Sequence, residues 1–275
     1  MYGGYLTKAV SAEADFGIVF IHNKGYSDHC GHVVIALSSV AIKPGWVKRT
    51  VPETKVGIDA PCGYIETHVK WNGSKVGGLS FTNVPSLVFV RDASVITPSF
   101  GEVKGDIVFC GAFYFYTSSK PWNIPVQLSK VEALTKLSME VKTVASKKYK
   151  VEHPFIPEIN HIYGTIIDND PNTKEGTQAN VCIFADREVD RSPTGSGTAG
   201  RVAQLFLRDK IQKGEYLVNE SIIGSIFRGK VIEAVKYEGC DAAVAEIEES
   251  ANVLGFASWT IDSDNDIAKD FLVRE

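Results

Sequence analysis

Apolar and polar residues follow one another in an order that predicts a strand, a loop and a helix near the start of the chain. Residues 16–22 (FGIVFIH) are rich in β-branched and aromatic side chains, which favour a strand. The stretch HCGHVVIALSSVAI follows a glycine-containing loop and predicts a helix that begins near Gly31 and ends before Pro44. Residues 56–115 form short apolar runs broken by Gly, Pro and Asn, which predicts a meandering antiparallel sheet.

The second part of the chain repeats this order of elements. Apolar residues recur at every third or fourth position over residues 128–148 and predict an amphipathic helix. Residues 180–185 (NVCIFA) predict a strand, and residues 197–211 predict a helix after a polar loop. The strand, loop and helix unit of the first part therefore returns later in the chain.

The two units share a register. Phe20 precedes Cys30 by ten residues, and Phe184 precedes Thr194 by the same interval. Cys30 and Thr194 are each followed by a glycine and a predicted helix, and they lie 164 residues apart. We infer an internal pseudo-repeat, in which two similar halves direct their helix N-termini towards each other. A chance agreement between two common units is the alternative.

Composition and charge argue against several classes of protein. Of the 275 residues, 44% are hydrophobic and 23% are charged, and no stretch approaches the ~18 consecutive apolar residues of a membrane span. The net charge is −4 without a Lys/Arg-rich block, which argues against nucleic acid as a partner. Five dispersed cysteines and the lack of a signal-peptide pattern favour a cytoplasmic protein. We expect neither a metal nor another cofactor, because no cluster has metal-ligand spacing.

The segment DRSPTGSGTAG contains glycines at the spacing G-x-G-x-x-G, at Gly195, Gly197 and Gly200. A dinucleotide fingerprint needs its first glycine directly after the strand, whereas eight residues, 187–194, intervene here. A Walker loop is excluded because no Lys-Ser/Thr pair follows the glycines. The plainer interpretation is that the glycines permit a turn and the start of a helix.

Cys30 lies at the predicted start of a helix and is a candidate base or nucleophile. The helix dipole and the free N–H groups favour a thiolate, so we expect a lowered pKa for Cys30. The same N–H groups would bind a carboxylate. A cysteine beside a helix is also commonly a small buried apolar residue, and a histidine such as His32 is commonly structural.

Four segments resemble the proline racemase superfamily. DHCGHVVIAL and NVCIFADREVDRSPTGSGTAG are similar to its two active-site signatures, and GAFY (111–114) and FRGKV (227–231) match two further segments in the same order. The resemblance extends over essentially the whole chain. It implies an α/β (α+β) fold like that of diaminopimelate epimerase, with two similar halves that each curl a sheet around a central helix and hold the substrate in the cleft between them.

The resemblance divides the chain into residues 1–105, which carry Cys30, and residues 106–275, which carry Thr194. We expect the last residues to return to the first half. Family members usually carry several dozen residues before the segment that corresponds to the start of this chain, so we expect the first half to lack opening strands and a helix. The resemblance is compatible with a homodimer, which no sequence feature specifies.

The resemblance also implies roles for individual residues. Cys30 corresponds to the first catalytic cysteine of the family, and Thr194 stands where racemases and 4-hydroxyproline epimerases carry a second cysteine. This combination resembles the trans-3-hydroxy-L-proline dehydratase branch. Asp190 is expected to meet the ring nitrogen of the substrate. The other expected substrate-binding residues are Gly31 and His32 and, for the carboxylate, Gly195 and Ser196.

Acid–base chemistry favours dehydration over racemisation. Two-base racemisation needs an acid or base on each face of the α-carbon, and a threonine hydroxyl, whose pKa lies far above the ~8.5 of a thiol, is a poor base near neutral pH. Dehydration needs a single base. We therefore expect a cofactor-independent hydro-lyase in which the Cys30 thiolate removes the α-proton and trans-3-hydroxy-L-proline becomes 1-pyrroline-2-carboxylate. The alternatives are a proline racemase or 4-hydroxyproline 2-epimerase, and a catalytically silent ligand-binding protein.

Overall fold

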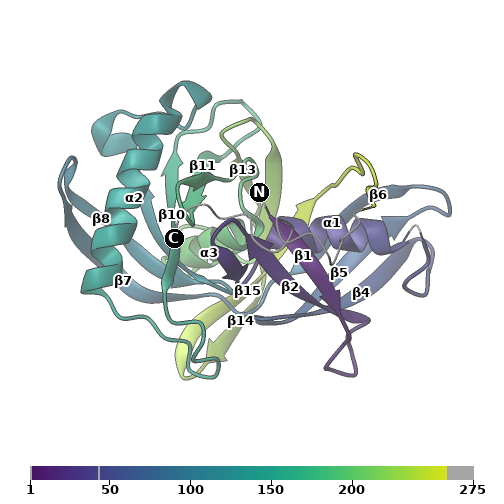
Figure 1. Cartoon of the computed structure of the whole chain (residues 1–275). Helices are drawn as coiled ribbons and strands as arrows, with labels where there is room; N and C mark the ends of the chain where they lie inside the picture. Colours follow the sequence, from purple (N-terminus) through teal and green to yellow (C-terminus); the bar gives the residue numbers. More distant parts are fainter. Residues whose placement is uncertain (1, 43, 259–275) are drawn as a thin grey trace, which may run out of the picture.

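The computed structural model describes residues 2–42 and 44–258, which form one mixed β-sheet and three α-helices (Figure 1). In the first part of the chain, strands curl around one helix. The elements of this part are β1 (Gly3–Thr7), β2 (Phe16–His22), β3 (Gly25–Ser27), α1 (Gly31–Ile42), β4 (Glu53–Ala60), β5 (Gly63–Trp71) and β6 (Val76–Thr82). The helix, α1, packs against β4, β5 and β6 and buries Val34, Ile35 and Ile42.

The second part of the chain contains the other two α-helices. The predicted amphipathic helix buries Leu134, Leu137 and Val141, as its apolar spacing requires. The elements of this part are β7 (Leu87–Thr97), β8 (Gly101–Phe109), β9 (Phe113–Ser118), η1 (Lys120–Trp122), η2 (Leu128–Lys130), α2 (Val131–Lys148), β10 (Ile162–Asn169), β11 (Gln178–Phe184), β12 (Glu188–Val189), α3 (Gly195–Phe206), β13 (Leu217–Glu220), β14 (Ile226–Tyr237) and β15 (Cys240–Glu249).

Neighbouring strands of the sheet follow the order β1-β2-β4-β5-β6-β15-β14-β13-β11-β10-β9-β8-β7, with β3 beside β2 and β12 beside β11. Figure 1 shows α1 over β4 and β5 on one side, α2 beside β7 and β10 on the other, and α3 between them. The antiparallel hairpins predicted over residues 56–115 are present, but the single meander is wrong. The reason is that β6 pairs with β15 instead of β7.

β15 joins the two parts of the sheet. Its residues pair with β6 on one side and with β14 on the other. The boundary expected between residues 105 and 106 falls inside β8, and the division into halves stays a prediction. Residues 259–275 lie outside the described part of the chain, so the predicted return of the last residues also stays a prediction.

α3 differs by a few residues from the helix predicted over residues 197–211. It begins at Gly195 because the N–H of Thr198 already donates to the carbonyl of Thr194, at 2.7 Å. It ends at Phe206, and Asp209 then adopts a φ of 56°, which interrupts any continuation of the helix. The early start brings the first turn of α3 closer to α1.

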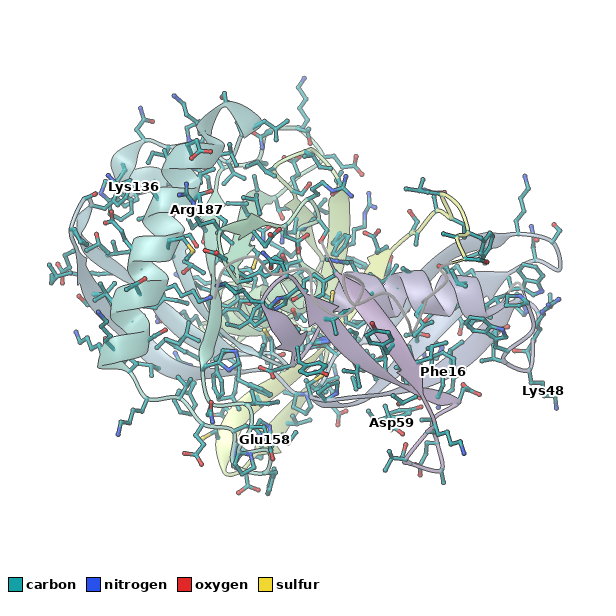
Figure 2. All side chains as sticks on the ribbon, viewed as in Figure 1. Phe16, Lys48, Asp59, Lys136, Glu158 and Arg187 are labelled. Atoms are coloured by element: carbon teal, nitrogen blue, oxygen red, sulfur yellow. The ribbon has the colours of Figure 1, made fainter. Side chains whose placement is uncertain are left out.

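Figure 2 shows the side chains on the ribbon, those of the surface among them. Asp59 fastens the loop between β1 and β2, because its carboxylate accepts hydrogen bonds from the N–H groups of Val10 (2.6 Å) and Ser11 (2.8 Å). Lys48 and Lys136 lie on the exposed outside of the molecule. None of the helices in the described ranges is long and apolar enough to cross a membrane.

Candidate active site

The N-termini of α1 and α3 meet at their first residues, Gly31 and Gly195. A Cβ atom placed on Gly31 would lie 2.7 Å from the Cα of Gly195, and one placed on Gly195 would lie 2.8 Å from the Cα of Gly31. Neither position has room for a side chain. Free N–H groups of two helices therefore lie beside each other, which favours the binding of an anion such as a carboxylate.

The glycines of the G-x-G-x-x-G stretch serve this packing. Gly195 contacts the other helix, and side chains at Gly197 and Gly200 would collide with Ile166 and Tyr116. Each glycine thus allows α3 to approach a neighbouring element closely. Helix packing explains the spacing without a phosphate loop.

A narrow cavity lies where the two helix ends meet. The seven residues that the resemblance singled out all line it: Cys30, Gly31, His32, Asp190, Thr194, Gly195 and Ser196. Their catalytic and binding roles stay predictions. The remaining lining residues, which the sequence analysis did not assign to the site, are Tyr2, His29, Tyr114, Tyr163, Cys182 and Phe184.

Asp190 is the negatively charged group of the cavity and is held in place by hydrogen bonds. Its Oδ2 accepts from the hydroxyl of Thr194 (2.8 Å), and its Oδ1 accepts from the N–H (2.9 Å) and hydroxyl (3.0 Å) of Ser192. Nδ1 of His32 lies 3.7 Å from Oδ2. The carboxylate is buried and oriented, so it offers a fixed negative charge to a cationic ligand.

Thr194 has a strained backbone. Its φ of 63° lies in the left-handed region, which is unfavourable for a β-branched residue and costs about 1–3 kcal/mol. Neighbouring hydrogen bonds hold this conformation: the N–H of Thr194 donates to the hydroxyl of Ser192 (3.0 Å), and Nδ2 of Asn180 donates to the carbonyl of Pro193 (3.0 Å). The position of the Thr194 hydroxyl is therefore well defined.

Cys30 is buried directly before α1, and its carbonyl accepts the N–H of Val34 at 3.1 Å. Burial raises the pKa of the Cys30 thiol well above its ordinary value, and the charge of Asp190 raises it further. The N–H groups of His32 and Val33 favour the thiolate but do not offset the loss of water. The predicted lowering of the Cys30 pKa is therefore wrong.

Strands β9 and β11 supply site residues that the sequence analysis missed. Cys182 is buried in the cavity wall, which it shares with Thr194, so a second thiol belongs to the site. Phe184 lies two residues further on and reaches the same cavity, as period-two alternation along a strand allows. The hydroxyl of Tyr114 shares a hydrogen bond with that of Ser196, at 3.0 Å. Alternation within NVCIFA was the available signal for Cys182 and Phe184.

His29 connects the residue before Cys30 to the segment between β6 and β7. Nε2 of His29 donates to Oδ1 of Asn83 (2.7 Å), and Nδ2 of Asn83 donates to the carbonyl of Cys110 (3.1 Å). Burial lowers the pKa of His29 to about 4, so the ring is neutral at physiological pH. No group of three or more His, Cys, Asp or Glu side chains suited to a metal ion occurs within the described residues.

The fold and the cavity define a class of protein through comparison with solved structures. A probable proline racemase from Agrobacterium radiobacter K84, with bound carbonate, superposes with a TM-score of 0.92 at 22% identity, covering 98% of this chain and 79% of that one. The shared architecture is a mixed sheet with few helices, and the predicted α/β fold is confirmed.

The chain belongs to the proline racemase family, whose profile matches residues 1–272. It is 58% identical over 274 residues to the trans-3-hydroxy-L-proline dehydratase of Azospirillum brasilense, covering 100% of this chain and 82% of the relative. The 3-hydroxyproline 2-epimerase of Burkholderia multivorans has the same identity and coverage.

Proposed function

We propose that this protein eliminates water from trans-3-hydroxy-L-proline and forms 1-pyrroline-2-carboxylate. The observation that carries the proposal is the placement of the Cys30 thiol and the Thr194 hydroxyl beside two helix N-termini that touch. Several relatives at 58% identity are named trans-3-hydroxy-L-proline dehydratases, which supports the same substrate for this chain.

Two charged groups of the substrate have complementary partners in the cavity. Its carboxylate accepts hydrogen bonds from N–H groups at the starts of α1 and α3, at Gly31, Gly195 and Ser196. Its protonated ring nitrogen pairs with the carboxylate of Asp190, which Ser192 already orients. This arrangement presents the α-carbon to Cys30.

The reaction needs one residue that first takes a proton and then returns it. The Cys30 thiolate removes the α-proton, the α-carbon forms a double bond to C3, and the C3–O bond breaks. The hydroxyl leaves with the proton from the thiol as water, and the resulting enamine tautomerises to the cyclic imine. The carboxylate and the hydroxyl of this substrate lie on opposite ring faces, so the α-hydrogen and the hydroxyl share a face and one thiol serves both steps.

The substrate itself supplies part of the driving force for forming the thiolate. The charge of Asp190 raises the pKa of Cys30 in addition to burial. A cationic ring nitrogen paired with Asp190 cancels that contribution and favours the thiolate. Oriented N–H donors at the carboxylate stabilise the carbanion-like transition state by on the order of 3 kcal/mol each.

A second candidate function is the 2-epimerisation of 3-hydroxyproline. A relative with 58% identity carries that name, and Cys182 places a second thiol in the cavity next to Thr194. Epimerisation needs a proton donor on the ring face opposite Cys30, and Cys182 is the thiol available for it. The two functions share a substrate and differ in whether water is lost.

The experiment is to incubate the purified chain with trans-3-hydroxy-L-proline in D2O. Formation of the cyclic imine supports the dehydratase, whereas α-deuterated substrate and its C2 epimer without imine support the epimerase. We expect Cys30→Ser to lower the rate of imine formation by at least about 100-fold. Cys240→Ser is the matched control, because Cys240 is exposed and does not line the cavity. Binding of pyrrole-2-carboxylate without any turnover would favour the silent alternative.

A further inference from the structure

The hydroxyl of Tyr163 has no assigned role in the chemistry above. Tyr163 belongs to β10 and lines the cavity together with Cys182 and Asp190. Its side chain is 4% exposed, and its hydroxyl has no hydrogen-bond partner among the described residues. The ring stacks on Phe184, with centroids 5.5 Å apart and planes inclined by 16°, so packing fixes its direction.

Neighbouring tyrosines in the same cluster are satisfied. Tyr114 shares a hydrogen bond with Ser196, and the hydroxyl of Tyr116 donates to the carbonyl of Gly197 at 2.9 Å. An unpaired buried hydroxyl is unfavourable, because it loses its bonds to water without replacement. Tyr163 is therefore the hydroxyl in this cluster that a ligand polar group can complete.

Most other polar groups of the cavity have a partner or an assigned role in the proposed function. The hydroxyl of Thr194 donates to Asp190. The carboxylate of Asp190 is assigned to the ring nitrogen of the substrate. The N–H groups at the helix N-termini are assigned to the carboxylate of the substrate. The imidazole of His29 also carries an unpartnered atom, Nδ1, but its other nitrogen ties the ring to Asn83.

We propose that the Tyr163 hydroxyl binds the ring hydroxyl of the substrate and selects hydroxylated over plain pyrrolidine rings. This inference rests on the proposed function for the identity of the substrate class. A site that hydrogen-bonds a substrate hydroxyl discriminates against an analogue without it, since the protein group is then left buried and unpaired. Tyr163 is thus a specificity-determining residue whose removal leaves the carboxylate and nitrogen contacts intact.

The test compares Tyr163→Phe with Tyr149→Phe. Tyr149 lies outside the cavity, and its hydroxyl is bonded to the backbone of Ser94. We expect Tyr163→Phe to lower kcat/KM for trans-3-hydroxy-L-proline about tenfold while the Kd of pyrrole-2-carboxylate, which has no ring hydroxyl, changes by less than about twofold. Its Tm should be unchanged or higher. Tyr149→Phe should show the reverse: a lower Tm and unaltered kinetics.

Equal losses for both ligands, no loss for the hydroxylated one, or a clear drop in the Tm of Tyr163→Phe would overturn the inference. If the wild-type chain turns over no hydroxyproline, the proposed function fails and calorimetric binding decides the inference separately. A preference for trans-3-hydroxy-L-proline over L-proline that Tyr163→Phe abolishes supports it even then. Equal affinities of the wild-type chain for those two ligands contradict it.

Discussion

The contact between Gly31 and Gly195 makes the geometry of the site sensitive to a single methyl group. In Gly31→Ala the new Cβ would lie 2.7 Å from the Cα of Gly195 and 3.1 Å from Cζ of Phe81. Ordinary contacts between carbon atoms begin at about 3.5 Å. The two helix N-termini must therefore separate by about 0.8 Å, because the closest obstacle is backbone and cannot rotate away.

A shift of this size has two measurable consequences. Misplacing reacting groups by about 1 Å costs on the order of 100-fold in rate, so we expect kcat/KM for trans-3-hydroxy-L-proline to fall by about that factor. Forcing a methyl group into a packed interior costs about 1–3 kcal/mol of unfolding free energy. Steady-state kinetics and urea unfolding measure the two effects separately.

The matched control is Gly77→Ala in β6. A Cβ at Gly77 would find its nearest neighbour, Cβ of Lys70, at 3.8 Å, which is an ordinary contact. We expect this variant to retain wild-type kinetics. A Gly31→Ala protein that also keeps kcat/KM within about twofold of wild type would refute the requirement for touching helix ends.

Three further predictions concern charge. Because burial raises the pKa of Cys30, kcat/KM should keep rising past pH ~8.5. The charge of Asp190 also raises this pKa, so Asp190→Asn should shift the alkylation of Cys30 to lower pH. Burial of Asp106 raises the pKa of its carboxyl, but hydrogen bonds, foremost those from Arg208, together outweigh burial and lower that pKa. The ionised carboxylate therefore stabilises the fold above pH ~3.9, and this stabilisation is lost as the pH falls through the folded pKa. Urea unfolding of Asp106→Asn at pH 7 should show a loss of about 3 kcal/mol in the free energy of unfolding. Thr194→Cys should gain α-proton exchange in D2O, detected by NMR, because a thiol loses and regains its proton far more readily near neutral pH than a hydroxyl does.

The sequence was informative wherever local pattern determines structure. The helix start at Gly31 and its counterpart near Gly195 followed from strand, loop and helix units in one register, and their contact followed from the repeat. The position of β15 between the two parts of the sheet did not, because pairing with β6 joins residues 164 to 170 positions apart and no local signal specifies such a partner. Tyr163 was missed because the side of β10 that faces the cavity depends on the pairing of β10 with β9 and β11.

Burial, and not the helix N-terminus, determines the direction of the pKa shift of Cys30. A helix N-terminus favours a thiolate, but the N–H groups near Cys30 act against the loss of water on burial, and burial is the larger effect. The exclusion of water also strengthens the interactions between charges in the cavity, because it lowers the local dielectric constant. Under the proposed function, a cationic nitrogen paired with Asp190 cancels one of the influences that raise the pKa of Cys30. The proposed activation of Cys30 therefore depends in part on the charge that the substrate brings to Asp190.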